Sequence, residues 1–334
     1  MVPARCGTGS MQYDRQGFAS GGDGTRLFYG VRGPVPRDPA AADSAAGAER
    51  PAAPDVVLCD GIGCDGFAWK YLQPHLAERH RVTHWHYRAH GRSGLPQDPA
   101  RIDLPAHARD LIAVMDAAGI ESAILVGHSM GTQVALEAYR LAPDRVRGLV
   151  LMCGSYGKIT TTFHGSDVLK QVLPTIIEQV EKNQGLARAL WGRIPPGLAF
   201  RIAQLSREVD SLSIREEDFR WYMEHVATME PSIFFAMLRL AGEHTAEDVL
   251  PRIAVPALVL AAERDTFTPY SLAEHMAEVI PGAEFYLLRG ASHAAPVEQP
   301  VAIELRIAQW LADHFREEAP AASSQDDDSR KFAD

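Results

Sequence analysis

The chain has 334 residues, with 43 acidic and 33 basic side chains and a formal net charge of −10. This length suits one large α/β domain with an insertion. The acidic excess and the lack of Lys- and Arg-rich runs argue against binding to nucleic acid or to an anionic membrane. No stretch approaches the length of a membrane-spanning helix and the N-terminus lacks an apolar leader, so we expect a soluble, cytoplasmic protein.

The four cysteines, Cys6, Cys59, Cys64 and Cys153, form no C-x-x-C pair. We therefore expect neither a disulfide framework nor a zinc site. Cys59 and Cys153 lie in apolar runs and are expected to be buried. Cys64 falls in a loop that we place beside the candidate active site, where a reactive thiol is the less favoured alternative to a structural role.

The N-terminal part predicts a hairpin followed by a buried strand. Residues 1–10 have no periodic pattern and are expected to be disordered. Residues 17–30 predict two strands around a Gly-Gly-Asp-Gly turn. Residues 34–54, rich in Ala, Pro, Asp and Ser, predict a flexible loop. The apolar run VVLCD at 56–60, bounded by Gly61, is typical of a strand buried on both faces.

From residue 56 to residue 154 strands alternate with helices. This alternation implies an α/β protein with a mostly parallel, doubly wound sheet and right-handed crossovers. Ligands of such sheets bind at the carboxyl ends of the strands. After the first strand, helices are predicted over 71–80 and 103–119, strands within 81–94, 123–126 and 146–154, and a strand-turn-helix over 122–139.

Residues 155–250 carry helical patterns only, so we expect a helical cap above the carboxyl ends of the strands. Its aromatic and methionine side chains are expected mostly to pack between helices. The first part of the core is expected to span 11–154 and the second part 251–316, and the polar tail 317–334 is expected to be disordered. The cap helices are predicted over 168–183, 185–194, 198–209, 216–229 and 233–242; in the second part, strands are predicted over 255–265 and 283–290 and helices over 271–280 and 296–315.

The sequence Gly-His-Ser-Met-Gly separates a strand from a helix and predicts a nucleophile. A nucleophile at such a turn sits on a strained bend, and Gly127 and Gly131 remove side chains that would collide there. Ser129 is the candidate, with the backbone N–H of Met130 facing a developing oxyanion. We expect His128 to support the loop rather than to act as the base. A chance turn is the alternative to this interpretation.

A serine hydroxyl needs a base and a third group that orients the base. Asp265 and His293 each follow a predicted strand just past its carboxyl end, where Ser129 also lies. Glu263 is a rival acid, but Asp265 is favoured because the sequence Asp-Thr-Phe-Thr-Pro places it in the loop beyond the strand.

The order Ser129, Asp265, His293 is that of the α/β-hydrolase arrangement. With the motifs GHSMG, RAHGRSG, AERDTFTP and GASHAAPVEQP, the chain resembles the α/β-hydrolase superfamily, in the subgroup of cofactor-free haloperoxidases, esterases and lactonases with a helical cap. The resemblance covers most of residues 56–153 and 251–315. It implies the α/β-hydrolase fold, a catalytic Ser-His-Asp triad, no cofactor and a small-molecule ester substrate.

The loop after the first parallel strand departs from the family pattern. The family usually has His-Gly there, whereas this chain has Asp60-Gly61. By resemblance, Ile62 supplies the second oxyanion donor beside Met130. A carboxylate close to an oxyanion would oppose catalysis, so we expect Asp60 to be bound by the backbone or by a neighbour such as Arg88 or His90.

Three histidines, His84, His86 and His90, raise the possibility of a metal site, because His-x-His on a strand places two imidazoles on one face. No carboxylate set accompanies them, so no metal is expected. We expect a serine hydrolase that cleaves carboxylic esters. Hydrolysis of lactones or thioesters, perhydrolysis, and non-catalytic binding of a small molecule are the alternatives.

Overall fold

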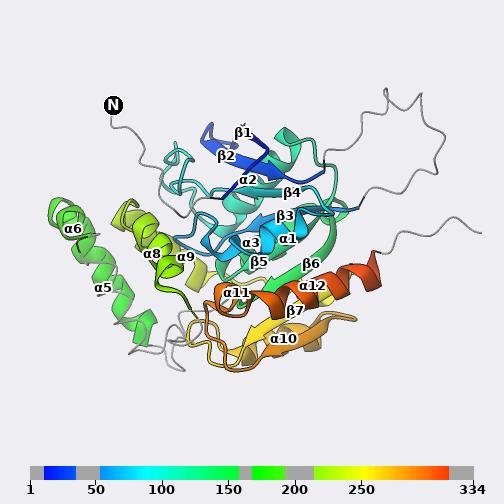
Figure 1. Cartoon of the computed structure of the whole chain (residues 1–334). Coiled ribbons are helices and arrows are strands. Elements are labelled where there is room, and N and C mark those ends of the chain that lie inside the picture. The colour runs from blue at the N-terminus through cyan, green and yellow to red at the C-terminus, as the bar shows by residue number, and fades with distance from the viewer. Residues whose placement is uncertain (1–10, 35–52, 158–167, 192, 194–213, 316–334) are drawn as a thin grey trace, which may run out of the picture.

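The structure is a computed structural model that describes residues 11–34, 53–157, 168–191, 193 and 214–315 (Figure 1). The two segments predicted to be disordered, 1–10 and 317–334, lie outside the described residues, as does most of the predicted loop 34–54. No helix of the described chain is both long and apolar enough to cross a membrane.

The described strands form one eight-stranded sheet in the order β1-β2-β4-β3-β5-β6-β7-β8. The pairs β1–β2 and β2–β4 are antiparallel, and the pairs that follow along the sheet are parallel. This topology confirms the mostly parallel sheet, and the predicted N-terminal hairpin is the β1–β2 pair. The strands are β1 Arg15–Ser20, β2 Arg26–Arg32, β3 Asp55–Cys59, β4 Val82–Trp85, β5 Ala123–His128, β6 Val146–Met152, β7 Ala257–Ala262 and β8 Glu284–Leu288.

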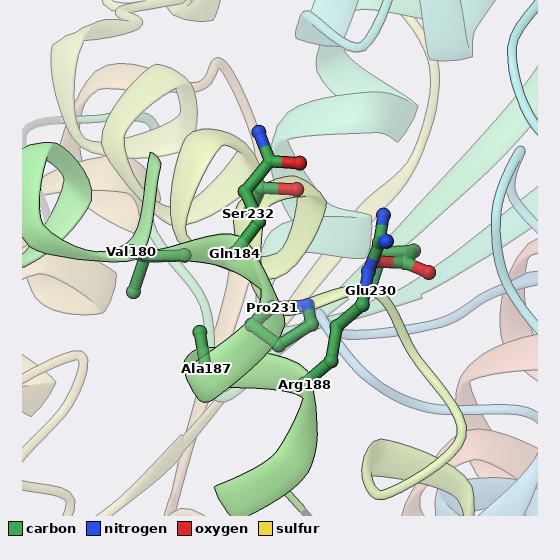
Figure 2. A pocket seen from close by; sticks show the side chains of 7 residues that line it. All are labelled: Val180, Gln184, Ala187, Arg188, Glu230, Pro231 and Ser232. Atoms are coloured by element: carbon green, nitrogen blue, oxygen red, sulfur yellow. The ribbon is translucent and has the colours of Figure 1, made fainter. Parts of the chain in front are cut away.

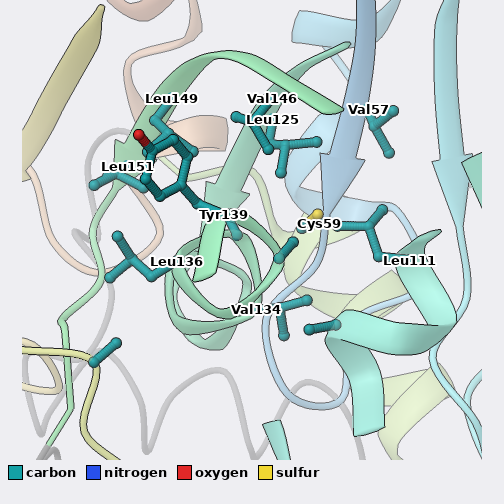
Figure 3. Close-up of a cluster of buried hydrophobic side chains, with 14 of the residues drawn as sticks. Val57, Cys59, Leu111, Leu125, Val134, Leu136, Tyr139, Val146, Leu149 and Leu151 are labelled. Carbon is teal, nitrogen blue, oxygen red and sulfur yellow. The ribbon is translucent and has the colours of Figure 1, made fainter. Parts of the chain in front are cut away.

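Helices cover both faces of the sheet, because alternate side chains of each central strand point to opposite faces. On β5, Leu125 packs into one cluster of buried side chains, with α2, α3 and α10 (Figure 3). Its neighbours Ile124 and Val126 pack into the other cluster, with α1, α11 and α12. The helices of the core are α1 Leu72–Leu76, α2 Leu104–Ala117, α3 Met130–Leu141, α10 Tyr270–Val279, α11 Ala295–Glu298 and α12 Pro300–His314, and the 3-10 turns are η2 Phe67–Trp69, η3 Pro143–Arg145 and η5 Leu250–Arg252.

In the described part of the segment between β6 and β7, four further helices lie to one side of the sheet (Figure 1). They agree with four of the five predicted helices in this region, and the fifth, 198–209, lies outside the described residues. Asp218 fixes this group to the core, since its buried carboxylate accepts hydrogen bonds from Tyr71 Oη at 2.9 Å and from Lys70 Nζ. The helices are α5 Val168–Lys182, α6 Gln184–Leu190, α8 Glu216–Val226 and α9 Pro231–Glu243.

Two predicted helices differ from those observed. The helix predicted over 71–80 is only α1, one short turn. The single helix predicted over 296–315 is wrong, since Gln299, with φ −129° and ψ 52°, separates α11 from α12. Proline explains the break: Pro300 has no N–H to continue α11, and its fixed φ suits the first turn of a new helix.

Candidate active site

Ser129 lies at the sharp turn between β5 and α3, with φ 56° and ψ −121°. Residues other than glycine rarely adopt a positive φ, and such strain concentrates at functional sites. A Cβ on Gly127 would lie 2.4 Å from the carbonyl oxygen of Gly131, and a Cβ on Gly131 would lie 2.0 Å from that of Cys59. Only glycine at both positions therefore allows this bend to sit against the end of β3.

The structure brings the three predicted residues Ser129, Asp265 and His293 together. His293 Nε2 lies 3.0 Å from Ser129 Oγ, and His293 Nδ1 lies 2.9 Å from Asp265 Oδ2. A carboxylate only accepts hydrogen bonds, so Nδ1 carries the proton and Nε2 can accept the proton of the serine hydroxyl. The side chain of Asp265 is fully buried, while that of His293 is 18% exposed and is open to a substrate.

The carboxylate of Asp265 is held from several sides. Its Oδ1 accepts hydrogen bonds from the backbone N–H of Phe267 at 2.9 Å and of Thr268 at 2.8 Å, and its Oδ2 also accepts from Thr268 Oγ1 at 2.8 Å. The rival acid Glu263 instead accepts from the backbone N–H of Gly290 at 2.8 Å. The structure thus pairs Asp265, and not Glu263, with His293.

The loop that carries His293 is supported by two buried side chains. Glu298 accepts hydrogen bonds from the backbone N–H of Ser292 at 2.7 Å and from its Oγ at 2.5 Å. Burial, and then the charge of His293, lowers the pKa of His128 to about 3, so His128 is neutral and its Nε2–H donates to the carbonyl oxygen of His293 at 3.0 Å. The supports Thr268 and Glu298 were not predicted, because their positions, three residues after Asp265 and six after Ser292, form no pattern that identifies them.

The loop after β3 lies directly against the nucleophile. A Cβ on Gly61 would lie 3.1 Å from Ser129 Cβ. Within the described part of the chain, the backbone N–H of Ile62 and that of Met130 have no hydrogen-bond acceptor. Met130 opens α3, whose first N–H groups have no partner inside the helix and favour negative charge.

Other groups of the same loop are already bonded. The N–H of Gly63 donates to His90 Nε2 at 3.1 Å, and the N–H of Cys64 donates to the carbonyl oxygen of Gly61 at 3.3 Å. Tyr87 Oη donates to the carbonyl oxygen of Asp60 at 2.8 Å. These bonds clamp the loop on both sides of Ile62.

Asp60 is bound by a neighbouring side chain, as expected, but that neighbour is His84 and not Arg88 or His90. His84 Nε2 lies 2.7 Å from Asp60 Oδ2, and His84 sits on β4 beside β3, within reach of the strand end. Arg88 is instead engaged by Asp110, with its Nε 2.7 Å from Asp110 Oδ2. His90 faces the backbone, since its Nδ1 lies 3.1 Å from the carbonyl oxygen of Arg88.

The remaining candidate residues of this region have structural contacts. His86 Nδ1 accepts a hydrogen bond from the N–H of Arg92 at 2.8 Å. Burial raises the pKa of the Cys64 thiol well above its usual value, which keeps the thiol protonated and unreactive. Among the residues that the structure describes, no group of three or more His, Cys, Asp or Glu side chains is arranged to hold a metal ion.

The helices α8 and α9 pack on the loop after β3. A Cβ on Gly63 would lie 2.9 Å from Val226 Cγ2 and 3.2 Å from Phe234 Cε2. Trp191, next to α6, packs against Phe234 with ring centroids 5.5 Å apart and ring planes tilted by 54°, and its indole N–H donates to the carbonyl oxygen of Val226 at 2.8 Å. The inserted helices therefore make apolar contact with the loop beside Ser129.

A shallow hollow lies elsewhere, between the α5–α6 pair and the start of α9 (Figure 2). It contains an ion pair, with Arg188 Nε 2.7 Å from Glu230 Oε2. None of its lining residues belongs to the group around Ser129. The candidate active site is therefore the group of Ser129, Asp265 and His293, where a nucleophile meets a base, and not this hollow. The lining residues are Val180, Gln184, Ala187, Arg188, Glu230, Pro231 and Ser232.

A second carboxyl group, Asp65, lies under α8 close to Asp60. Its Oδ2 is 3.5 Å from His225 Nδ1. Burial, and then the charge of Asp60, raises the pKa of Asp65 to about 7. Asp65 is therefore largely protonated below neutral pH, which keeps a second negative charge out of this region.

This shift predicts how stability depends on pH. Between its ordinary pKa and about 7, the folded Asp65 holds a proton that the unfolded chain has released, so stability falls as the pH rises through this window. Asp65→Asn removes this effect. Its free energy of unfolding relative to the wild type should therefore rise by about 2–3 kcal/mol between about pH 5 and about pH 8. Urea unfolding at each pH measures the difference, with Asp144→Asn at an exposed carboxyl correcting for net charge. A difference that does not change with pH would contradict the prediction.

Comparison with known proteins agrees with this architecture. A model of the alpha/beta hydrolase family matches residues 56–304. A curated protein from Azorhizobium caulinodans, whose name describes a carbamate hydrolase, RutD, is 27% identical over 286 residues, which is 85% of this chain and 93% of that protein. A thermophilic esterase from Thermogutta terrifontis matches with a TM-score of 0.69 at 23% identity, over 90% of this chain and 99% of its own. The enol-lactonase from Burkholderia xenovorans matches with a TM-score of 0.67 at 21% identity, over 89% and 100%.

The chain therefore belongs to the α/β-hydrolase family, and it is a hydrolase. The two solved structures support the fold. They do not decide the substrate, because one fold of this kind carries many chemistries.

Proposed function

We propose that this hydrolase is a serine carboxylesterase, with Ser129 as the nucleophile, His293 as the base and Asp265 as the group that orients the base. The observation that carries the proposal is the pair of hydrogen bonds on His293, at 3.0 Å to Ser129 Oγ and 2.9 Å to Asp265 Oδ2. These distances lie within the range needed for proton transfer from the nucleophile.

In the proposed reaction, His293 Nε2 takes the proton of Ser129 as Oγ attacks the ester carbonyl. Asp265 holds the imidazole in the required tautomer and stabilises the imidazolium that forms. His293 then gives this proton to the leaving alcohol, which leaves an acyl group on Ser129. Water, deprotonated by the same imidazole, attacks the acyl group and releases the carboxylic acid.

The backbone N–H groups of Ile62 and Met130 would bind the oxyanion of the tetrahedral intermediate. Two observations support this assignment: both N–H groups lack an acceptor in the described chain, and the loop of Ile62 abuts Ser129. Donors fixed in advance at the place where charge develops give a large share of the rate of acyl transfer.

We further propose that the helices between residues 155 and 250 act as a cap that shapes the substrate pocket. The contacts of Val226 and Phe234 with Gly63 support this role, since they place apolar side chains of α8 and α9 beside the loop that carries Ile62. A pocket with apolar walls suits an uncharged acyl chain.

Related acyl compounds are the alternatives. The relative whose name describes a carbamate hydrolase favours a carbamate as the second candidate substrate, because attack of Ser129 on a carbamate carbonyl needs the same base and the same oxyanion donors. The same catalytic groups also suit the hydrolysis of lactones and thioesters, and perhydrolysis.

The test is reaction with a fluorophosphonate probe, read by intact mass, with Ser129→Ala as the control. In parallel, p-nitrophenyl esters of increasing chain length are compared with a p-nitrophenyl carbamate and a lactone. We expect labelling of Ser129 and an optimum of chain length among the esters, both lost in Ser129→Ala. Faster turnover of the carbamate or the lactone would reassign the substrate class. The absence of labelling and of Ser129-dependent turnover would refute the proposal in favour of a non-catalytic binder.

A further inference from the structure

Three hydrogen-bonded side chains, the half-buried Tyr13 and the buried His84 and Asp60, stand next to the candidate oxyanion loop. Tyr13 Oη lies 2.7 Å from His84 Nδ1, and His84 Nε2 lies 2.7 Å from Asp60 Oδ2. The side chain of His84 is fully buried and that of Asp60 is 1% exposed. These hydrogen bonds link Tyr13, which lies ahead of β1, to strand β4 and to the end of β3.

The positions of the protons in these hydrogen bonds follow from the chemistry of the three side chains. Burial, and then the charge of Asp60, raises the pKa of Tyr13 well above its usual value, so the phenol stays neutral and its O–H donates to His84 Nδ1. His84 Nε2 then carries a proton that it donates to Asp60. Tyr13 thereby fixes the imidazole tautomer that suits the carboxylate.

His84 is central to keeping Asp60 in place. Within the described chain, the other oxygen of Asp60, Oδ1, is buried without a hydrogen-bond partner. A buried carboxylate is tolerated only when it is paired. The bond to His84 therefore fixes the side chain of Asp60, while Tyr87 holds the Asp60 carbonyl group.

We propose that Asp60 and His84 are positioning residues for the hydrolysis: their hydrogen bond, backed by Tyr13, holds residues 60–64 so that the N–H of Ile62 faces the oxyanion. This inference rests on the proposed function. In this arrangement the carboxylate of Asp60 stabilises the loop instead of opposing the oxyanion. A carboxylate that is hydrogen-bonded to an imidazole at the start of the loop can anchor the loop as firmly as another polar side chain would.

The test compares His84→Ala and Asp60→Ala with Asp60→Asn, which keeps an oxygen that accepts from His84. We expect kcat for p-nitrophenyl esters to fall about 100-fold in the two alanine variants, because a displaced oxyanion donor acts in the transition state. KM should change little, and Asp60→Asn should stay close to the wild type. Rates are expressed per Ser129 labelled by the fluorophosphonate, so that misfolded protein is not counted.

A matched control is His80→Ala, which also removes a buried imidazole. His80 Nδ1 lies 2.9 Å from the carbonyl oxygen of Pro54, directly before the start of β3, whereas the loop follows the end of β3. The kcat of this variant should be unchanged. Equal loss of kcat in His80→Ala, or wild-type kcat in His84→Ala, would overturn the proposal.

Amide hydrogen exchange tests whether the loop is held in place, independently of whether the protein cleaves esters. The N–H groups of Gly63 and Cys64 are hydrogen-bonded, and we expect their exchange to speed up in His84→Ala and Asp60→Ala but not in Asp60→Asn. Unchanged exchange would refute the clamp whether or not the protein cleaves esters. A wild type without Ser129-dependent turnover would instead refute the proposed function and, with it, the catalytic part of this inference.

Discussion

Asp265→Asn is expected to lower kcat/KM for p-nitrophenyl esters about 10⁴-fold. The amide group can donate a hydrogen bond to His293 Nδ1, which lies 2.9 Å from the side chain of Asp265. The imidazole would then carry its proton on Nε2, facing Ser129 Oγ, and could not accept the proton of the nucleophile. Steady-state kinetics at neutral pH measures the loss, and circular dichroism shows whether the fold is retained.

The matched control for this prediction is Glu263→Gln, at the other carboxyl group that the sequence offered as the acid. Glu263 is 38% exposed and is bound to Arg289 and to the N–H of Gly290, outside the group around Ser129. We expect kcat/KM to stay within about twofold of the wild type, as for most surface substitutions. Full activity in Asp265→Asn together with a large loss in Glu263→Gln would show that the acid is Glu263.

Gly131→Ala is expected to destabilise the protein by about 3 kcal/mol or more, or to prevent folding. The added Cβ would lie 2.0 Å from the carbonyl oxygen of Cys59 and 2.8 Å from that of Asp60. Both oxygens belong to the end of β3, which is fixed between β4 and β5 and cannot move away. The same clash would displace the loop that carries Ile62, so activity should fall with stability. Urea unfolding followed by circular dichroism measures the effect.

Gly185→Ala is the control for this substitution, because a Cβ on Gly185 in α6 would meet no atom within 4 Å. There the change should be neutral or should stabilise by up to about 1 kcal/mol, since alanine is the better helix former. If Gly131→Ala unfolded at the wild-type urea concentration, the tight contact between the nucleophile turn and β3 would be refuted.

Much of the fold could be predicted because its information is local. The apolar run Ala123–Val126 is followed by a glycine, and this pattern alone indicates a strand followed by a turn; the observed strand β5 continues to His128. Asp103 marks the start of α2, where its side chain accepts a hydrogen bond from the N–H of Ala106 at 2.8 Å. The break at Gln299 was missed, because a proline near a helix end is compatible both with one continuous helix and with a new start.

The group around Ser129 could also be anticipated, for a topological reason. Strand ends of a parallel sheet meet at one edge, so residues just after predicted strands can be expected to converge there. The partners of the supporting side chains could not be anticipated in the same way. Neither Glu298, bound to Ser292, nor His128, bound to the carbonyl group of His293, has a sequence pattern that reveals its partner.

The order of most strands and helices, the family, and the candidate residues Ser129, Asp265 and His293 were therefore predictable from the amino-acid sequence. Which buried polar groups meet became visible only in the folded chain. The partner of Asp60 is His84, 24 positions away and on a neighbouring strand, and not the arginine or the histidine that the loop sequence suggested. The physical reason is that strand and helix patterns arise from neighbours along the chain, whereas a hydrogen bond depends on atoms within about 3 Å of each other, which only the packed fold brings together.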